Sequence, residues 1–299
     1  MHRTFLTSLC VAAILCFGPA AQAQDFHDII RPDFGDAPRP FRFERFSYGT
    51  KAWQRGSIIA AKLPDAPVVI ALPPHPAMTE AYVYGYSWFP TFLYDHGYAY
   101  ATFRAPPTRS APGDEFASGL AEGVAEVVRQ ARERGFDGSR LILVGDGWSG
   151  LSAALLANDP KYLEQAGVPF STIKGVLILD GKGLDLAGEL GRVSDFTRKQ
   201  IGRWAPTPEA VRNGSPTDQA AAPNAPHFLF QALRNNGRSA ANAAALAEAL
   251  RQAGADVEIR TVSDAQEARD TDLGNPRSQE NDALVGFLAR ATGRGTATN

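Results

Sequence analysis

Residues 144–150 read VGDGWSG, a glycine-rich stretch that joins two segments of different character. The apolar run RLILVGD before the turn (140–146) predicts a buried strand, and SGLSAALLAND after it (149–159) predicts a helix. A strand, a sharp glycine-rich turn and a helix in this order usually present a catalytic nucleophile at the tip of the turn. The tip residue here is Gly147, so the stretch raises the question whether the protein has a nucleophile at all.

The segments on both sides of this turn alternate between strand and helix. Short apolar or β-branched runs predict strands over residues 41–49, 54–63, 66–74, 98–107, 140–146, 174–181, 227–233 and 257–263. Helical spacing of apolar residues predicts helices over residues 86–97, 114–135, 149–159, 239–254 and 279–292. This alternation predicts an α/β fold with a mainly parallel central sheet and helices on both faces.

A single domain over residues 41–290 accounts for these elements, because the chain has no internal repeat and no sign of a second core. Residues 183–224 interrupt the alternation and are long for a connection. We expect them to form a small cap over the edge of the sheet at which the strands end. Residues 24–40 read as an irregular lead-in, and residues 291–299 as a flexible tail.

The first 23 residues have the pattern of a secretory signal peptide. A weakly positive start precedes the apolar run from Leu6 to Phe17, and Ala21-Gln22-Ala23 has the spacing of a cleavage site. The apolar run is too short for a stable membrane span. We therefore expect export to the periplasm or beyond, without stable insertion into a membrane.

The composition excludes several classes of partner and chemistry. The chain has 30 Lys and Arg residues against 32 Asp and Glu residues and no polybasic run, which argues against nucleic acid as a partner. Both cysteines, Cys10 and Cys16, lie in the expected signal peptide, so the mature chain has no disulfide or thiolate chemistry. The histidines are scattered without metal-ligand spacing, and we expect neither a metal nor another cofactor.

The order of these segments resembles the α/β-hydrolase superfamily, in particular its esterase/lipase-like, carboxylesterase-type branch. The likeness covers residues 41–290 and is carried by segments 47–72, 135–150, 175–186, 225–259 and 269–288. It implies an α/β-hydrolase fold with a Ser-His-Asp triad and a set of backbone N–H groups that stabilise an oxyanion. The catalytic motifs are degenerate at each of these positions.

The nucleophile motif of the family, Gly-x-Ser-x-Gly, aligns with residues 145–149. Gly145 then takes the first glycine position, Gly147 the serine position and Ser149 the last glycine position. Glycine has no side-chain oxygen and cannot attack a carbonyl. Two displaced nucleophiles are conceivable: Ser149 if the register slips by two residues, and Asp146 as in the carboxylate-driven dehalogenases of the superfamily.

The base and the acid of the triad are also missing from their expected positions. The resemblance places the catalytic histidine at Gln266, and glutamine is no useful base near neutral pH. No carboxylate follows the strand at 227–233 closely enough to be the acid. Asp180, at the end of the preceding strand, is a candidate vestigial acid, but it has no histidine to orient.

The oxyanion loop and the aromatic stretch after it suggest what the cleft retains. The loop reads Pro73-Pro74-His75-Pro76, and three of these four residues have no N–H to donate. His75 is a candidate ligand contact at the rim of the pocket. The tyrosines of the segment AYVYGY alternate, and together with Trp148 at the turn they suit an apolar or aromatic ligand: Tyr82, Tyr84 and Tyr86.

Three hypotheses follow for the function. The first is an exported pseudoenzyme that does not hydrolyse esters and binds a small apolar or aromatic ligand, or another exported protein, through the vestigial cleft. The second is a carboxylesterase-like hydrolase that uses Ser149 or Asp146 with help from His75. The third is a structural or regulatory subunit of an active relative. Loss of four parts of one catalytic apparatus, in a chain whose scaffold still matches, favours the first.

Overall fold

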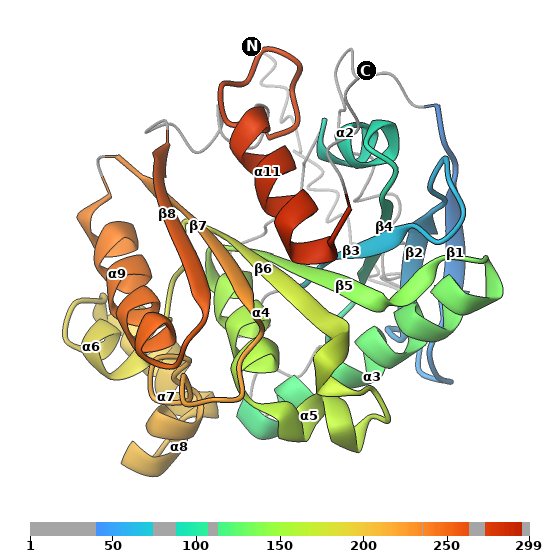
Figure 1. Ribbon diagram of the computed structural model, residues 1–299. Helices are drawn as coiled ribbons and strands as arrows, with labels where there is room; N and C mark the ends of the chain where they lie inside the picture. Colours follow the sequence, from blue (N-terminus) through green and yellow to red (C-terminus); the bar gives the residue numbers. More distant parts are fainter. Residues whose placement is uncertain (1–39, 74–87, 107–112, 235, 263–272, 295–299) are drawn as a thin grey trace, which may run out of the picture.

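The computed structural model describes residues 40–73, 88–106, 113–234, 236–262 and 273–294. An eight-stranded sheet forms its centre, with the strand order β1-β2-β4-β3-β5-β6-β7-β8 (Figure 1). The strands are β1 (Phe43–Ser47), β2 (Arg55–Ile59), β3 (Pro67–Ala71), β4 (Ala99–Phe103), β5 (Asp137–Asp146), β6 (Ile173–Leu179), β7 (His227–Leu233) and β8 (Asp256–Val262).

The sheet is mainly parallel, as the sequence predicts. β1 and β2 pair antiparallel, β2 also runs antiparallel to β4, and the other strand pairs are parallel. β3 and β4 are buried at every residue, which explains why their sequences are continuous apolar runs instead of alternating ones. The carboxyl ends of the parallel strands therefore meet at one edge of the sheet, where the glycine-rich turn also lies.

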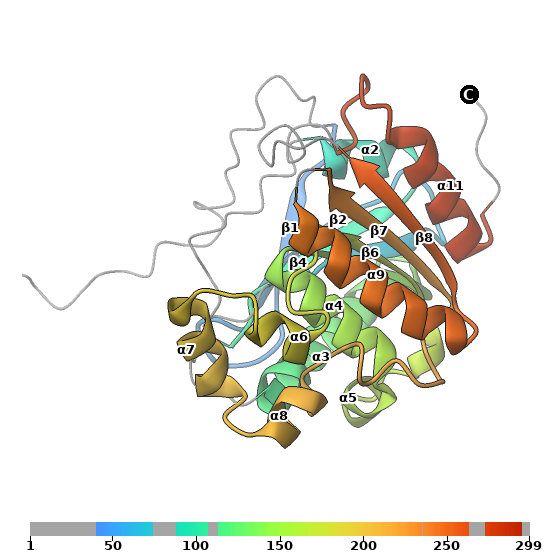
Figure 2. The same cartoon turned by 90° about the vertical axis from the view of Figure 1, so that its left-hand side faces the viewer.

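Helices cover both faces of the sheet. They are α2 (Phe89–Asp95), α3 (Gly113–Glu133), α4 (Trp148–Asn158), α5 (Pro160–Gln165), α6 (Leu186–Leu190), α7 (Asp195–Trp204), α8 (Pro208–Asn213), α9 (Gly237–Gln252) and α11 (Asn281–Thr292), with a 3-10 turn at Phe170–Thr172. Figures 1 and 2 show α2 and α11 on one side of the sheet and α3, α4 and α9 on the other. This arrangement confirms the predicted α/β class.

Two apolar clusters fill the spaces between the sheet and these helices. Successive side chains of a strand point to opposite faces, so each strand supplies both clusters. In β7, Phe228 and Phe230 join the cluster that contains α3, α4 and α9. Leu229, between them, joins the cluster that contains Phe287 of α11 and Phe92 of α2. The sheet is thus the shared middle layer of both cores.

The segment predicted to form a cap contains three short helices, α6, α7 and α8, which lie together at one corner of the molecule (Figure 2). A third apolar cluster joins Leu186, Ile201 and Trp204 of this segment to Leu151 and Leu155 of α4. Through α4, the segment packs beside the turn at residues 145–149.

The predicted elements agree with the structure to within a few residues. α11 ends at Thr292, the residue at which the sequence predicts the last helix to end, and Ala291 and Thr292 are buried. The expected signal peptide and nearly all of the lead-in lie outside the described residues. Within the described part of the chain, no helix combines the length and the apolar character that crossing a bilayer requires.

Candidate functional site

The turn between β5 and α4 is sharp and held in place by backbone hydrogen bonds. Gly147 has φ 55° and ψ −119°, a conformation that L side chains rarely adopt. Its N–H donates to the Leu179 carbonyl at the end of β6 (2.8 Å), and its carbonyl accepts from Gly150 N (3.1 Å) and Lys182 N (3.0 Å). These bonds place the tip of the turn above the carboxyl ends of β5 and β6, as in a nucleophile elbow.

Gly145 explains why the strand and the helix can approach so closely at this elbow. A β-carbon on residue 145 would lie 2.2 Å from the Ser149 carbonyl oxygen and 2.6 Å from the Gly150 nitrogen. Both contacts are with backbone, which cannot rotate away as a flexible side chain would. Only glycine therefore fits the first position of the motif.

Gly147 at the tip meets a different environment. Among the described residues, a β-carbon built on residue 147 would have only Lys182 within 4 Å, with its Cδ and Nζ atoms each at 3.9 Å. The position that carries the serine in the family pattern is thus sterically open. Of the side chains that the structure describes, the nearest to that position is Lys182, whose amine comes from the loop after β6.

Ser149, the first candidate for a displaced nucleophile, is completely buried. Its Oγ accepts the Asp146 N–H at 2.6 Å and donates to the Asp146 carbonyl at 2.9 Å. The hydroxyl therefore closes the first turn of α4 onto the end of β5, and both hydrogen bonds serve the backbone. Asp146, the second candidate, is the last residue of β5 and lies one position before the tip.

Asp180, the candidate vestigial acid, immediately follows β6 and is held in a strained backbone conformation. Its φ is 46°, which is uncommon for a residue with a side chain, and its exposed fraction is 2%. Its carboxylate accepts a hydrogen bond from Asn236 Nδ2 at 2.9 Å, and its N–H donates to the Gln231 carbonyl at 2.8 Å. Asn236 follows β7, where the family resemblance places the triad acid.

The structure thus brings the elbow and Asp180 together at one edge of the sheet. The Leu179 carbonyl binds the Gly147 N–H, and Asp180 is the next residue along the chain. The other predicted site residues lie outside the described part of the chain: His75, Gln266, Tyr82, Tyr84 and Tyr86.

Trp148, predicted to contact a ligand, packs against the cap segment. It borders the apolar cluster formed by α4, α6 and α7. A β-carbon on Gly183 would lie 2.4 Å from a ring carbon of Trp148, so the indole lies directly against the backbone of the loop after β6. Trp148 therefore joins the elbow to the segment that follows β6.

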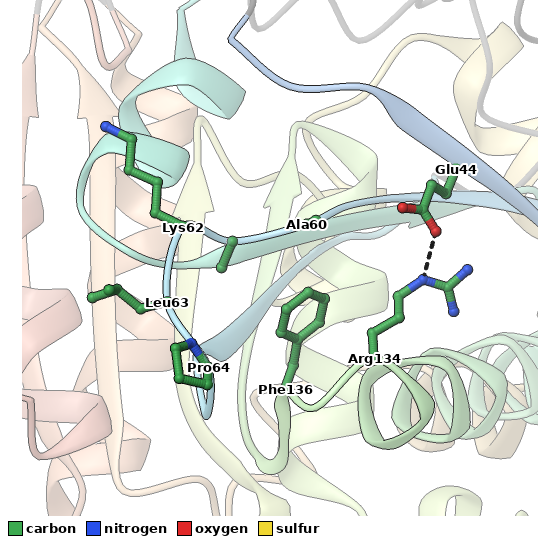
Figure 3. A pocket seen from close by; sticks show the side chains of 8 residues that line it. Glu44, Ala60, Lys62, Leu63, Pro64, Arg134 and Phe136 are labelled. Carbon is green, nitrogen blue, oxygen red and sulfur yellow. Dashed lines mark hydrogen bonds and ion pairs between the residues drawn. The ribbon is translucent and has the colours of Figure 1, made fainter.

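A hollow of about 400 Å³ lies at the opposite edge of the sheet (Figure 3). The residues after β2 and before β5 line it, which places it at the amino ends of the parallel strands. Phe136 lies between Pro64 and an ion pair of Glu44 with Arg134, in which Nε and Oε2 are 2.9 Å apart. His227 also lies at this edge and pairs with Asp256 at 3.0 Å, so it is remote from the elbow.

No group of three or more metal-ligating side chains occurs among the residues that the structure describes. Two residues at this site were not predicted from the sequence, Lys182 and Asn236. Asn236 precedes a predicted helix and is a residue type that caps helices, which its contact with Ser239 N confirms. Lys182 carries no comparable signal, because its place depends on the path of a loop.

Comparison with solved structures places this fold among esterases. Esterase B from Lactobacillus rhamnosis, solved with an inhibitor, aligns with a TM-score of 0.71 and 14% identity over 86% of this chain and 89% of that chain. Esterase 2 from Thermogutta terrifontis, solved with propionate, gives a TM-score of 0.61 and 16% identity over 86% and 96%. A mutant of the esterase rPPE gives 0.62 and 16% over 87% and 84%.

The protein has the α/β-hydrolase fold, and its structural neighbours belong to the esterase-like branch that the sequence resembles. At identities of 14% to 16% the likeness concerns the fold. No protein-family model matches this sequence, and no curated protein matches it in sequence. The function must therefore be argued from the site itself.

Proposed function

We propose that the protein is an exported α/β-hydrolase-fold pseudoenzyme that binds a small apolar or aromatic ligand and does not hydrolyse esters. The observation that carries this proposal is the glycine at the tip of an otherwise complete elbow. Gly147 keeps the positive φ and the hydrogen bonds of the turn, while it supplies no nucleophilic atom.

The surroundings of the elbow support the same conclusion. A serine nucleophile must expose its Oγ to the substrate and to a base. Ser149 Oγ is buried, and both of its hydrogen bonds go to the backbone of Asp146. Gln266 stands where the resemblance expects the histidine, so the base is missing from its expected position.

The fold and one structural neighbour support the place and the size class that we propose for the ligand. Open α/β sheets bind ligands at the carboxyl ends of their strands, which is the edge that carries the elbow. The esterase of T. terrifontis has been solved with propionate, and a small acyl-sized ligand is the class that we transfer to this chain. The aromatic segment at residues 81–100 begins directly after the oxyanion loop and supplies the apolar contacts in this proposal.

Hydrolysis of short p-nitrophenyl esters by the purified mature protein tests the proposal. We expect no release of nitrophenol above the buffer rate, and no repeated turnover for Gly147→Ser, which restores a hydroxyl without a base. Ser149→Ala and Asp146→Asn are the matched variants. Multiple turnovers in the native protein that disappear in either variant would establish the displaced-nucleophile esterase instead.

A further inference from the structure

Lys182 occupies a defined place beside the tip of the elbow. Its backbone N–H donates to the Gly147 carbonyl at 3.0 Å, which fixes the start of the side chain next to the turn. The chain then runs along the open side of Gly147, with Cδ and Nζ both 3.9 Å from the position of a β-carbon on residue 147. The ammonium group therefore lies close to the volume that a nucleophile and its bound acyl group occupy in an esterase of this fold.

No carboxylate among the described residues forms a hydrogen bond or an ion pair with this ammonium group. The two nearest acidic residues along the chain have other partners. Asp180 accepts from Asn236 at 2.9 Å. Asp185 caps α6 by accepting from Gly188 N at 3.0 Å and also pairs with Arg192 at 3.4 Å.

The other lysine at β6 shows the contrast. Lys174 lies near the start of the strand and donates from Nζ to the Ser171 carbonyl at 2.6 Å, within its own loop. Lys182, three residues past the end of the same strand, is half-buried like Lys174, but its ammonium group has no such acceptor among the described residues. A half-buried ammonium group gains from an anionic partner more than an exposed one does, because water screens the pair less.

We propose that Lys182 binds the carboxylate of a small organic acid at the elbow, so that the ligand of the pseudoenzyme is a free acid and not an ester. This inference rests on the proposed function and gives the ligand its chemical class. The carboxylate takes the place of the acyl group that an active relative would hold over its serine. The positive end of the dipole of α4, an 11-residue helix that starts at Trp148, favours the same sign of charge.

A pair of isosteric probes tests the proposal by fluorine NMR: para-trifluoromethylbenzoate and its neutral amide, para-trifluoromethylbenzamide. We expect the mature protein to bind the benzoate about tenfold more tightly than the amide, as a charge-assisted hydrogen bond to a partly buried lysine implies. Lys182→Met should remove this preference, and Lys182→Arg should keep most of it. Lys174→Met, the same loss of charge at the opposite end of β6, should bind both probes as the native protein does.

The outcomes separate this inference from the function on which it rests. Equal binding of benzoate and amide in the native protein would overturn the carboxylate assignment and leave a neutral-ligand pseudoenzyme standing. A benzoate preference that survives in Lys182→Met would overturn the role of Lys182. Binding of neither probe, together with multiple ester turnovers, would overturn both proposals. Thermal unfolding of each variant checks that the loss of preference does not come from unfolding.

Discussion

The two edges of the central sheet differ in the ion pairing of their charged side chains. At the amino ends of the strands, side chains are paired with partners close in space: Asp137 accepts from Ser139 N at 2.8 Å, and His227 pairs with Asp256 at 3.0 Å. At the carboxyl ends, the Asp180 carboxylate accepts from the neutral Asn236 amide at 2.9 Å, and the Lys182 ammonium group forms no ion pair with any residue that the structure describes.

Backbone strain occurs at both edges, since Asp65 before β3 (φ 52°) and Asp180 after β6 (φ 46°) both have a positive φ; the edges differ in the ion pairing of their charged side chains. A residue such as Asp180 in the left-handed region costs of the order of 1–3 kcal/mol, and such residues gather at functional sites. Gly147 keeps the geometry of an elbow and supplies no nucleophilic atom, and the proposed function uses this site for binding.

The largest expected effect concerns the two glycines of the elbow. Gly145→Ala would force a β-carbon against the Ser149 backbone, and we expect a loss of about 3 kcal/mol or more in the free energy of unfolding. Gly147→Ala is the matched control, because its β-carbon meets only Lys182 at an ordinary 3.9 Å among the described residues, and the positive φ disfavours it by about 1–3 kcal/mol. Urea unfolding measures both, and equal losses would contradict the described geometry of the turn.

The cap segment should depend on one buried carboxylate. Glu189 is fully buried, and its Oε2 accepts from Asn242 Nδ2 of α9 at 2.6 Å. Asn242→Ala leaves this carboxylate without that donor, so we expect a loss of about 2–3 kcal/mol. Arg238→Ala, which removes a longer contact of 3.6 Å between a half-exposed guanidinium and the same carboxylate, should cost less than Asn242→Ala, because water screens the guanidinium. Equal unfolding free energies for the two variants would refute the assignment of Asn242 as the anchor.

The hydrogen bond that links the segments after β6 and β7 should contribute less to stability than the contact of Asn242 with Glu189. Asn236 both caps α9 and donates to Asp180, so Asn236→Ala should lower the unfolding free energy by about 2 kcal/mol. Asn236→Ser keeps a good capping residue but is too short to reach the carboxylate, and we expect about half of that loss. If the serine variant is as stable as the native protein, the bond to Asp180 contributes nothing.

The smallest expected effect on stability concerns Asp137, at the amino ends of the strands. Burial raises the pKa of Asp137, but hydrogen bonds from Ser139 and Arg140 outweigh burial and lower this pKa below its ordinary value. A lowered pKa in the folded state stabilises the protein above the ordinary Asp pKa, and this contribution is lost as the pH falls through the lowered value. The native protein should therefore exceed Asp137→Asn in stability by under about 1 kcal/mol at neutral pH.

Urea midpoints of both forms, measured from neutral pH down to about pH 3, should converge as the carboxylate is protonated. A constant difference over that range would mean that the hydrogen bonds of Asp137 do not depend on its charge.

The sequence predicts the fold because the local strand and helix patterns agree with the order of elements along the chain. Apolar runs and helical spacing place the described strands and helices, and the strand before Gly147 and the helix after it fix the register of the elbow. The same register predicts Gly145 as the first glycine of the motif. Glycine is required there because a β-carbon would meet the Ser149 backbone.

The contacts that the sequence could not predict join segments far apart in the chain. Asp180 and Asn236 are separated by 56 residues and meet because β6 and β7 are neighbours in the sheet. Lys182 reaches Gly147 because the loop after β6 turns back to the elbow, and no local pattern encodes that path. Trp148 is a similar case, since its packing depends on where the cap segment settles on α4.

The central claim is that this elbow carries no nucleophile, and labelling with a fluorophosphonate tests it most directly. The reagent phosphonylates activated serines, so the intact protein and its peptides are analysed by mass spectrometry, with the T. terrifontis esterase, which has been solved phosphonylated by sarin, as positive control. We predict no adduct on the native chain under conditions that label the control completely. A stoichiometric phosphonyl adduct on Ser149 would contradict the account, because it would require an exposed and activated hydroxyl at a residue that the structure buries.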